Sequence, residues 1–288
     1  MRSTRMPTVL KSGSDEFPFV SLPALYNAFQ LASRYLWYLL HASNGRGHGI
    51  HSPFVFDFIT KVLNDHREPE AFGRIESYRR ALRESRDILT VEDFGAGSAY
   101  GSARQRTVAE IARRAAKPAR YGRLLYRIAE HYHCRHVLEL GTSLGVSTAY
   151  LASAPGVNRV VTMEGARAIA ARAREGFGSL GLDNIQLVEG NFDDTLEGAL
   201  ARIPQADLVF VDGNHREEPT LRYFRQCMQK TGGESIFIFD DIHWSPEMES
   251  AWAQIKDHPD VRCTIDLFFV GIVFFRDAFR EKQHFVIR

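Results

Sequence analysis

Short apolar runs alternate with amphipathic helices along the second half of the chain. Strand-like runs occupy residues 136–140, 159–163, 185–188, 208–211, 235–239, 262–267 and 271–275. Helical spacing of apolar positions fills most intervals, at residues 146–153, 166–180, 194–203, 217–229 and 247–257. This alternation is typical of βαβ units, and the last two runs, which lack a helix between them, should pair antiparallel at one edge. The pattern predicts an α/β fold with a doubly wound, mostly parallel sheet of seven strands.

The first 120 residues show no such alternation. Residues 1–20 have no periodicity and should form a loose tail. Apolar spacing and a Ser-Pro helix start predict helices at residues 22–41, 52–63, 75–85 and 107–116. We therefore divide the chain into an N-terminal helical extension, residues 1–120, that caps the pocket, and an α/β domain, residues 121–288.

Composition indicates the cellular compartment of the protein but does not identify a binding partner. The chain has 36 Lys and Arg against 35 Asp and Glu, for a net charge of +1, but residues 74–127 hold 13 basic and 6 acidic residues. The three cysteines form no CxxC pattern and fit a reducing compartment. No apolar run typical of a signal peptide begins the chain, and the short apolar segment 31–40 contains Arg34. We expect a cytoplasmic protein without a membrane partner.

A glycine turn follows the first strand-like run. It reads Glu139-Leu140-Gly141-Thr142-Ser143-Leu144-Gly145-Val146-Ser147, a Glu-x-Gly-x-x-x-Gly pattern and not the GxGxxG of dinucleotide binders. Glycines permit a tight turn and close approach of the backbone to a ligand. A carboxylate inside the turn would repel a pyrophosphate but suits a cationic ligand such as S-adenosylmethionine (SAM). The candidate cofactor-binding residues here are Glu139, Gly141, Thr142, Ser143, Gly145 and Ser147.

Two further strand ends agree with a nucleoside cofactor. Glu164 ends the second run, where an acidic side chain can accept hydrogen bonds from ribose hydroxyls. Gly190, Asn191 and Phe192 follow the third run, where an adenine would lie. A rival glycine segment, Gly95–Gly101, has no clear apolar strand leading into it and is interpreted as a flexible loop over the active site.

Carboxylates end the fourth and fifth strand-like runs. Asp212-Gly213-Asn214-His215 follows one run and Asp240-Asp241 the other. Because the carboxyl ends of parallel strands share one edge of a sheet, these groups should form a site for a hard cation and a base. Structural alternatives remain open: Asp240 or Asp241 as a cap of the helix at Pro246, and His215 as a loop hydrogen-bonding residue. His243 and Trp244 suit packing or the pocket rim, and His48 and His51 suit structural roles more than the site.

On these motifs, residues 121–288 resemble the class I SAM-dependent methyltransferases, which implies a Rossmann-like fold. The aspartates resemble the magnesium site of catechol O-methyltransferase-like enzymes, and Asp212-Gly213-Asn214-His215 is similar to an Asp-x-x-His element of bacterial sugar O-methyltransferases. The resemblance implies that Asp212, Asp240 and Asp241 bind Mg²⁺ and that His215 takes the hydroxyl proton. It also implies that Glu139, Gly141 and Glu164 hold SAM, with Asp212 adjoining it.

The resulting hypothesis is a SAM-dependent O-methyltransferase that acts on a small hydroxylated molecule with Mg²⁺ assistance. The basic stretch 74–127 keeps an RNA-directed methyltransferase as an alternative, which is weakened because Asp212-Gly213-Asn214-His215 is not the Asn/Asp-Pro-Pro-aromatic element of base methyltransferases. A non-catalytic SAM-binding protein is the third alternative. A monomer and a homodimer are both compatible with the sequence, and the substrate is not specified by it.

Overall fold

One mixed sheet forms the centre of the molecule. The computed structural model describes residues 25–43, 45–47, 49–92, 103–115 and 117–288. Within them, an eight-stranded sheet has the order β10-β8-β9-β7-β6-β3-β4-β5. The strands are β3 (His136–Leu140), β4 (Arg159–Glu164), β5 (Ile185–Glu189), β6 (Leu208–Val211), β7 (Ile236–Asp240), β8 (Cys263–Asp266), β9 (Val270–Phe274) and β10 (Gln283–Val286).

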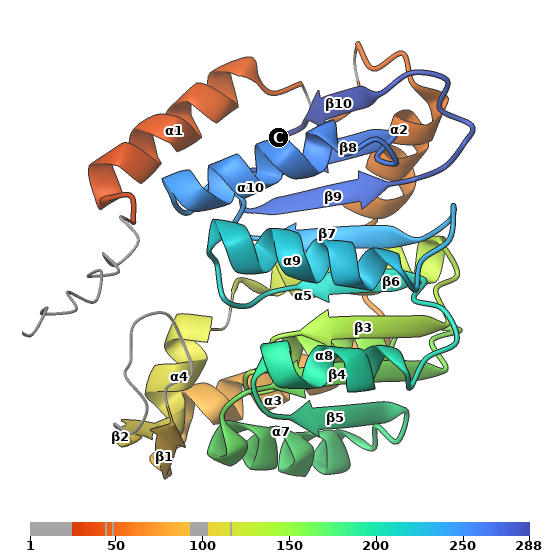
Figure 1. Cartoon of the computed structure of the whole chain (residues 1–288). Coiled ribbons are helices and arrows are strands. Elements are labelled where there is room, and N and C mark those ends of the chain that lie inside the picture. The colour runs from red at the N-terminus through yellow and green to blue at the C-terminus, as the bar shows by residue number, and fades with distance from the viewer. Residues whose placement is uncertain (1–24, 44, 48, 93–102, 116) are drawn as a thin grey trace, which may run out of the picture.

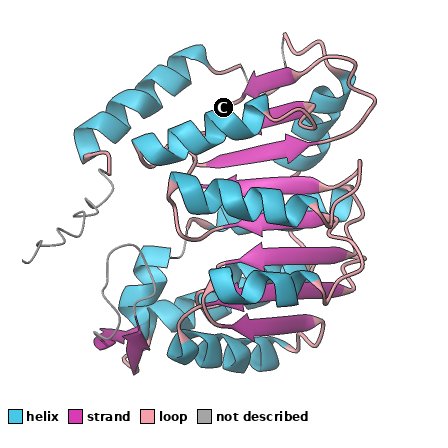
Figure 2. Ribbon diagram, viewed as in Figure 1, coloured by secondary structure: helices cyan, strands magenta, loops and turns pink. Residues whose placement is uncertain are grey.

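Strands β3 to β7 run parallel, so their carboxyl ends lie along one edge of the sheet. Strand β9 is antiparallel to both β7 and β8, while β10 is parallel to β8. All residues of β6 and β7 are buried, because helices cover both faces of the sheet (Figure 2). This burial explains why residues 208–211 and 236–239 are continuously apolar.

Two groups of helices cover opposite faces of the sheet (Figure 1). One face is covered by α8 (Phe192–Leu200), α9 (Glu217–Met228) and α10 (Pro246–Asp257). The other packs against α5 (Ala119–His131), α6 (Val146–Ala152) and residues of the helical stretch formed by α2 (Pro53–Phe58), η1 (Ile59–Leu63) and α3 (Glu70–Glu84). The described part of the N-terminal region thus shares a hydrophobic core with the sheet, and the proposed boundary at residue 120 falls inside α5.

Helix α1 (Ala28–His41) docks beside the C-terminal strands (Figure 1). Asn27 caps it, accepting from the amide of Gln30. The Tyr38 hydroxyl donates to the carbonyl of Ile287, and Arg34 pairs with Glu249 of α10 at 3.2 Å. No helix in the described part of the chain is long and apolar enough to cross a membrane.

Two expectations about strands need correction. The sheet has eight described strands and not seven, because residues 283–286 add β10 outside β8; this strand is only partly buried and was too short and polar to recognise. The antiparallel pairing of β8 and β9 is confirmed, although β10 and not this pair forms the edge of the sheet.

The segment before the Gly95–Gly101 glycines does form a strand, contrary to expectation. This strand, β1 (Ile88–Glu92), pairs with β2 (Ala103–Thr107) in a separate two-stranded sheet, next to α4 (Val108–Ala115). The Gly95–Gly101 loop itself lies outside the described residues.

Candidate active site

A cavity of about 290 Å³ opens at the carboxyl ends of β3, β6 and β7. It contains eight of the predicted site residues: Gly141, Thr142, Ser143, Ser147, Asp212, His215, Asp240 and Asp241. Residues of α3, of α4, of the segment before α5 and of α5 itself complete its wall, among them Glu76, Arg79, Arg114 and Lys117. The two acidic strand ends and the glycine turn are therefore brought together, as the sequence predicted, and the N-terminal helices contribute to the same cavity.

The glycine turn and the end of β6 are in backbone contact. Gly141 has φ +110°, and a Cβ atom at this position would lie 2.0 Å from the carbonyl oxygen of Asp212. The amide of Asp212 donates to the carbonyl of Leu140 at 2.8 Å. Gly145 has φ +78°, and its Cβ would lie 2.4 Å from the ring of Phe177. Only glycine meets both the conformational and the steric requirement at these positions.

Glu139 supports this turn from beneath. Its side chain is fully buried and accepts hydrogen bonds from the hydroxyls of Ser147 (2.6 Å), Thr148 and Thr162 (2.6 Å). Burial raises the pKa of Glu139 to about 7, against the effect of these donors. Glu139 does not line the cavity, so its expected contact with the cofactor stays a prediction to which the geometry gives no direct support.

Glu164 connects the end of β4 to the same turn. Its carboxylate accepts from the amide of Ser143 at 2.8 Å and from that of Ala166 at 2.9 Å. Burial raises the pKa of Glu164, although the backbone donors oppose this. The register pairs Glu164 with Glu189 at the end of β5, so the next strand end is adjacent.

Gly190, Asn191 and Phe192 lie after β5, outside the lining of the 290 Å³ cavity. Gly190 has φ +129°, and the side chain of Asn191 caps α8 by accepting from the amide of Asp193 at 3.2 Å. The Phe192 ring packs edge-on to Tyr223, with ring centroids 5.9 Å apart, and lies against Gly213. Phe192 therefore touches the loop that carries Asp212 and His215.

Asp212 and His215 lie next to each other in the cavity wall. Nε2 of His215 lies 3.5 Å from Oδ1 of Asp212. Asn214, with φ +61°, provides the sharp turn between them, and its side chain donates to the Tyr223 hydroxyl. Burial raises the pKa of Asp212 to about 6, and burial together with Asp212 raises that of Asp240 well above its usual range. The close carboxylates at this edge therefore favour retention of a proton.

Lys117 lies at this site, although no feature of the sequence placed it there. Its ammonium group lies 2.8 Å from Oδ1 of Asp241 and is hydrogen-bonded to Oδ1 of Asp240. Burial alone would lower the pKa of Lys117, but Asp240, Asp241 and Asp212 raise it above its usual value. In the sequence, Lys117 is one of 13 basic residues in a basic stretch, and nothing there links it to carboxylates more than 120 positions away.

The three aspartates do not form a metal-ligand set in this arrangement. Their residue types fit Mg²⁺. However, within the part of the chain that the structure describes, no group of three or more His, Cys, Asp or Glu side chains is arranged to hold a metal ion. The position between Asp240 and Asp241 is taken by the ammonium of Lys117. The magnesium site stays a prediction, and no step is derived through it.

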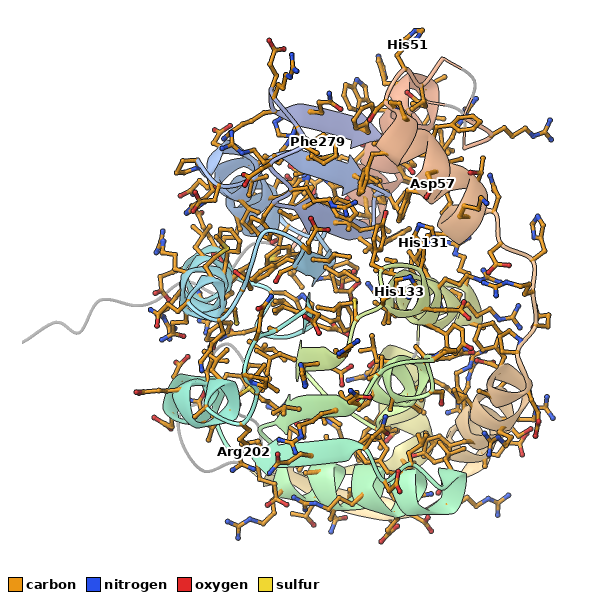
Figure 3. All side chains as sticks on the ribbon, turned by 90° about the vertical axis from the view of Figure 1, so that its right-hand side faces the viewer. His51, Asp57, His131, His133, Arg202 and Phe279 are labelled. Carbon is orange, nitrogen blue, oxygen red and sulfur yellow. The ribbon has the colours of Figure 1, made fainter. Side chains whose placement is uncertain are left out.

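Of the other side chains considered in the sequence, His243, Trp244 and His51 lie outside the lining of the cavity. Ser245, and neither Asp240 nor Asp241, caps α10. His243 is held between Asp266 (2.8 Å) and Glu249 (3.1 Å) and stacks on Phe268, while Trp244 is 38% exposed. His51 is exposed at the amino-terminal edge of the parallel strands, far from the cavity (Figure 3). His48 lies outside the described residues.

Comparison with known sequences finds a family match in the central region of the chain. Residues 138–242 match the family described as a methyltransferase domain. A catechol O-methyltransferase of Mycobacterium tuberculosis is 34% identical over 131 residues, or 45% of this chain and 58% of the relative. The match thus spans little more than half the length of that relative.

Solved structures share the fold at low sequence identity. The SAH-bound methyltransferase of Podospora anserina has a TM-score of 0.55 and 16% identity, covering 78% of this chain and 97% of its own. An O-methyltransferase of Streptomyces achromogenes in complex with SAM has a TM-score of 0.52 and 20% identity, covering 73% and 91%. The O-methyltransferase of Bacillus cereus in complex with SAH has a TM-score of 0.52 and 18% identity, covering 77% and 97%. The methyltransferase fold expected from the sequence is confirmed.

Proposed function

We propose that this chain, in which residues 138–242 are a methyltransferase domain of the class I fold, transfers the methyl group of SAM to a hydroxyl of a small molecule. One observation carries the proposal: the backbone contact between Gly141 and Asp212. This contact brings the turn with cofactor-binding chemistry beside a carboxylate and an imidazole, the groups that can receive a hydroxyl proton.

The carboxyl edge fits the chemistry of SAM. When bound, SAM supplies a methyl group on a positively charged sulfur, next to an ammonium and two ribose hydroxyls but no phosphate. Glu164 has the acceptor chemistry for the ribose hydroxyls, and its bond to the Ser143 amide fixes it beside the turn. Asp212 offers a negative charge to the ammonium or sulfonium. The segment 190–192 would border the adenine.

His215 is the candidate general base. A neutral hydroxyl is a poor nucleophile, so removal of its proton as the new bond forms assists the reaction. In the proposed step, the hydroxyl oxygen forms the C–O bond as the C–S bond breaks, and the bonding electron pair passes to sulfur, which becomes a neutral thioether. The hydroxyl proton passes to the imidazole of His215, and Asp212, 3.5 Å away, stabilises the imidazolium. Positioning within the cavity contributes the rest of the rate acceleration.

A small acceptor agrees with the size and the wall of the cavity. The volume of the cavity, about 290 Å³, is at the lower end of small-ligand pockets, and residues of α3 and α4 form part of its wall. The basic stretch also has local charge partners: Arg79 pairs with Glu76, Arg123 with Glu68 and Arg127 with Asp65. These pairs favour a structural role for the arginines over an RNA surface.

Transfer of a labelled methyl group tests the proposal. The protein would be incubated with SAM carrying a tritiated methyl group and a panel of catechols, phenols and sugars. Each compound is matched with an analogue whose hydroxyls are already methylated. Label should enter only compounds with a free hydroxyl. Label in RNA but in none of the small molecules would support the RNA alternative, and SAM binding without transfer to any acceptor would support a non-catalytic SAM-binding protein.

A further inference from the structure

We propose that the ammonium group of Lys117 is the cation that neutralises the aspartates of this site, in the position that the sequence predicted for Mg²⁺. This inference rests on the proposed function, because it assigns the charge that would orient the acceptor oxygen of that reaction. It makes methyl transfer by this chain independent of a divalent metal.

The position of the ammonium is the first support. Lys117 lies in the wall of the cavity together with Asp212, His215, Asp240 and Asp241. Its Nζ bonds to one carboxylate oxygen of each adjacent aspartate at the end of β7. The Asp240 side chain is only 2% exposed, so a charged partner compensates its loss of water.

The backbone of Lys117 is fixed independently of these ion pairs. The guanidinium of Arg79 donates to the carbonyl of Lys117 at 3.1 Å. Arg79 is itself paired with Glu76, which accepts from the Tyr150 hydroxyl at 2.8 Å. Pro118, the N-cap residue of α5, follows directly and restricts the chain after Lys117. The contact with α3 and the start of α5 therefore hold the backbone of Lys117 in place beside the carboxylates.

The local backbone also orients one of the carboxylates. Asp241 has φ +54°, its amide donates to the carbonyl of Phe269 at 2.7 Å, and its carbonyl accepts from the amide of Trp244 at 2.9 Å. These bonds fix the Asp241 backbone in a conformation that few residues adopt. Its side chain meets the ammonium there and caps no helix.

An ammonium has three N–H donors, and two are directed to Asp240 and Asp241. Among the residues that the structure describes, no third acceptor bonds to this ammonium, so one N–H can bond to an oxygen in the cavity that Lys117 lines. A hydroxyl that accepts this bond can donate its own proton to His215 at the same wall. Lys117 would thereby orient the acceptor and stabilise the negative charge that develops on its oxygen, as a preorganised electrostatic group.

Binding of Mn²⁺, followed by its electron paramagnetic resonance signal, tests this inference. The full chain and its Lys117→Met and Lys117→Arg variants would be titrated, with Lys61→Met, a substitution at an exposed lysine of η1, as the matched control. We expect no stoichiometric Mn²⁺ site below about 1 mM in the unmodified protein, in Lys61→Met or in Lys117→Arg. Lys117→Met, which leaves three carboxylates without their cation, should bind Mn²⁺ at least tenfold more tightly.

Activity provides a second readout on the same samples. Chelator should leave the rate of the unmodified protein unchanged, and Mn²⁺ should restore activity to Lys117→Met but not change that of Lys61→Met. Stoichiometric Mn²⁺ binding to the unmodified protein that Lys117→Met does not tighten, and that Asp241→Asn abolishes, would overturn the inference. If Lys117→Met fails to fold, Lys117→Arg and Asp241→Asn still decide it by the same binding measurement. Calorimetry with SAM on these samples tests the proposed function separately.

Discussion

The α-carbon of Gly141 lies directly against the main-chain carbonyl of Asp212, so closely that a Cβ at residue 141 would be 2.0 Å from that oxygen. The contact joins the turn after β3 to the end of β6, two neighbouring strands of the sheet. It holds the glycine turn, which is the candidate cofactor-binding segment, next to Asp212 and His215. Disturbing it should affect both halves of the site at once.

Gly141→Ala should therefore be strongly destabilising. The substitution combines an unfavourable φ of +110° with a backbone clash, and we expect a loss of about 3 kcal/mol in the free energy of unfolding. Urea denaturation would measure it. Gly178→Ala is the matched control, because Gly178 lies exposed in α7 (Arg167–Leu180) with nothing near its Cβ; it should raise stability by about 0.5–1 kcal/mol. If both substitutions changed the free energy of unfolding equally, the contact between Gly141 and Asp212 would not contribute to stability.

His215→Ala should impair chemistry and leave cofactor binding intact. We expect kcat to fall by about 10²–10⁴-fold, the usual contribution of general-base catalysis, with an unchanged dissociation constant for SAM. Steady-state kinetics with a labelled methyl group measures the first and calorimetry the second. His51→Ala, at the opposite edge of the sheet, should behave as the unmodified protein (Figure 3). A His215→Ala variant with full kcat would exclude the general-base role.

Glu139 should make the stability of the protein depend on pH. Its pKa is about 7 in the folded protein, against 4.5 for an ordinary glutamate. An acid that binds protons more tightly when folded loses stabilisation as pH rises from about 4.5 to 7. Glu139→Gln removes this titration, so its stability relative to the unmodified protein should improve between pH 5 and 8 by roughly 3 kcal/mol. Parallel pH dependence of the two melting temperatures would contradict the burial effect.

The sequence predicted the sheet well where burial on both faces determines the residue types. The run 208–211 is fully apolar because both faces of β6 are covered, and its predicted limits are those observed. Strand β10 lacks this signature because it is partly exposed at the sheet edge, and its pairing with β8 is determined by tertiary contacts. The pairing of β1 with β2 was missed for a related reason, since the apolar run of β1 is short and ends at the charged Glu92.

The candidate site was predictable where residues adjoin strand ends, and less so where a side chain's direction matters. Topology alone brings Asp212, Asp240 and Asp241 to one edge. The sequence did not reveal that Glu139 points beneath the turn, towards the hydroxyls of Ser147 and Thr148 at the start of α6. Nor did it reveal that Lys117 enters the acidic cluster, because that contact depends on how α5 packs against the sheet.

Calorimetry with SAM on three proteins, the unmodified chain, Glu164→Ala and Glu189→Ala, measures whether SAM binds at the carboxyl edge beside Glu164. Glu189 is the register partner of Glu164 on β5, but its carboxylate pairs outward with Arg174 and Arg167. We predict one SAM per chain for the unmodified protein, an affinity about 10- to 100-fold weaker for Glu164→Ala, and an unchanged affinity for Glu189→Ala. Absence of SAM binding by the unmodified protein, or equal affinities in all three, would show that SAM does not bind beside Glu164.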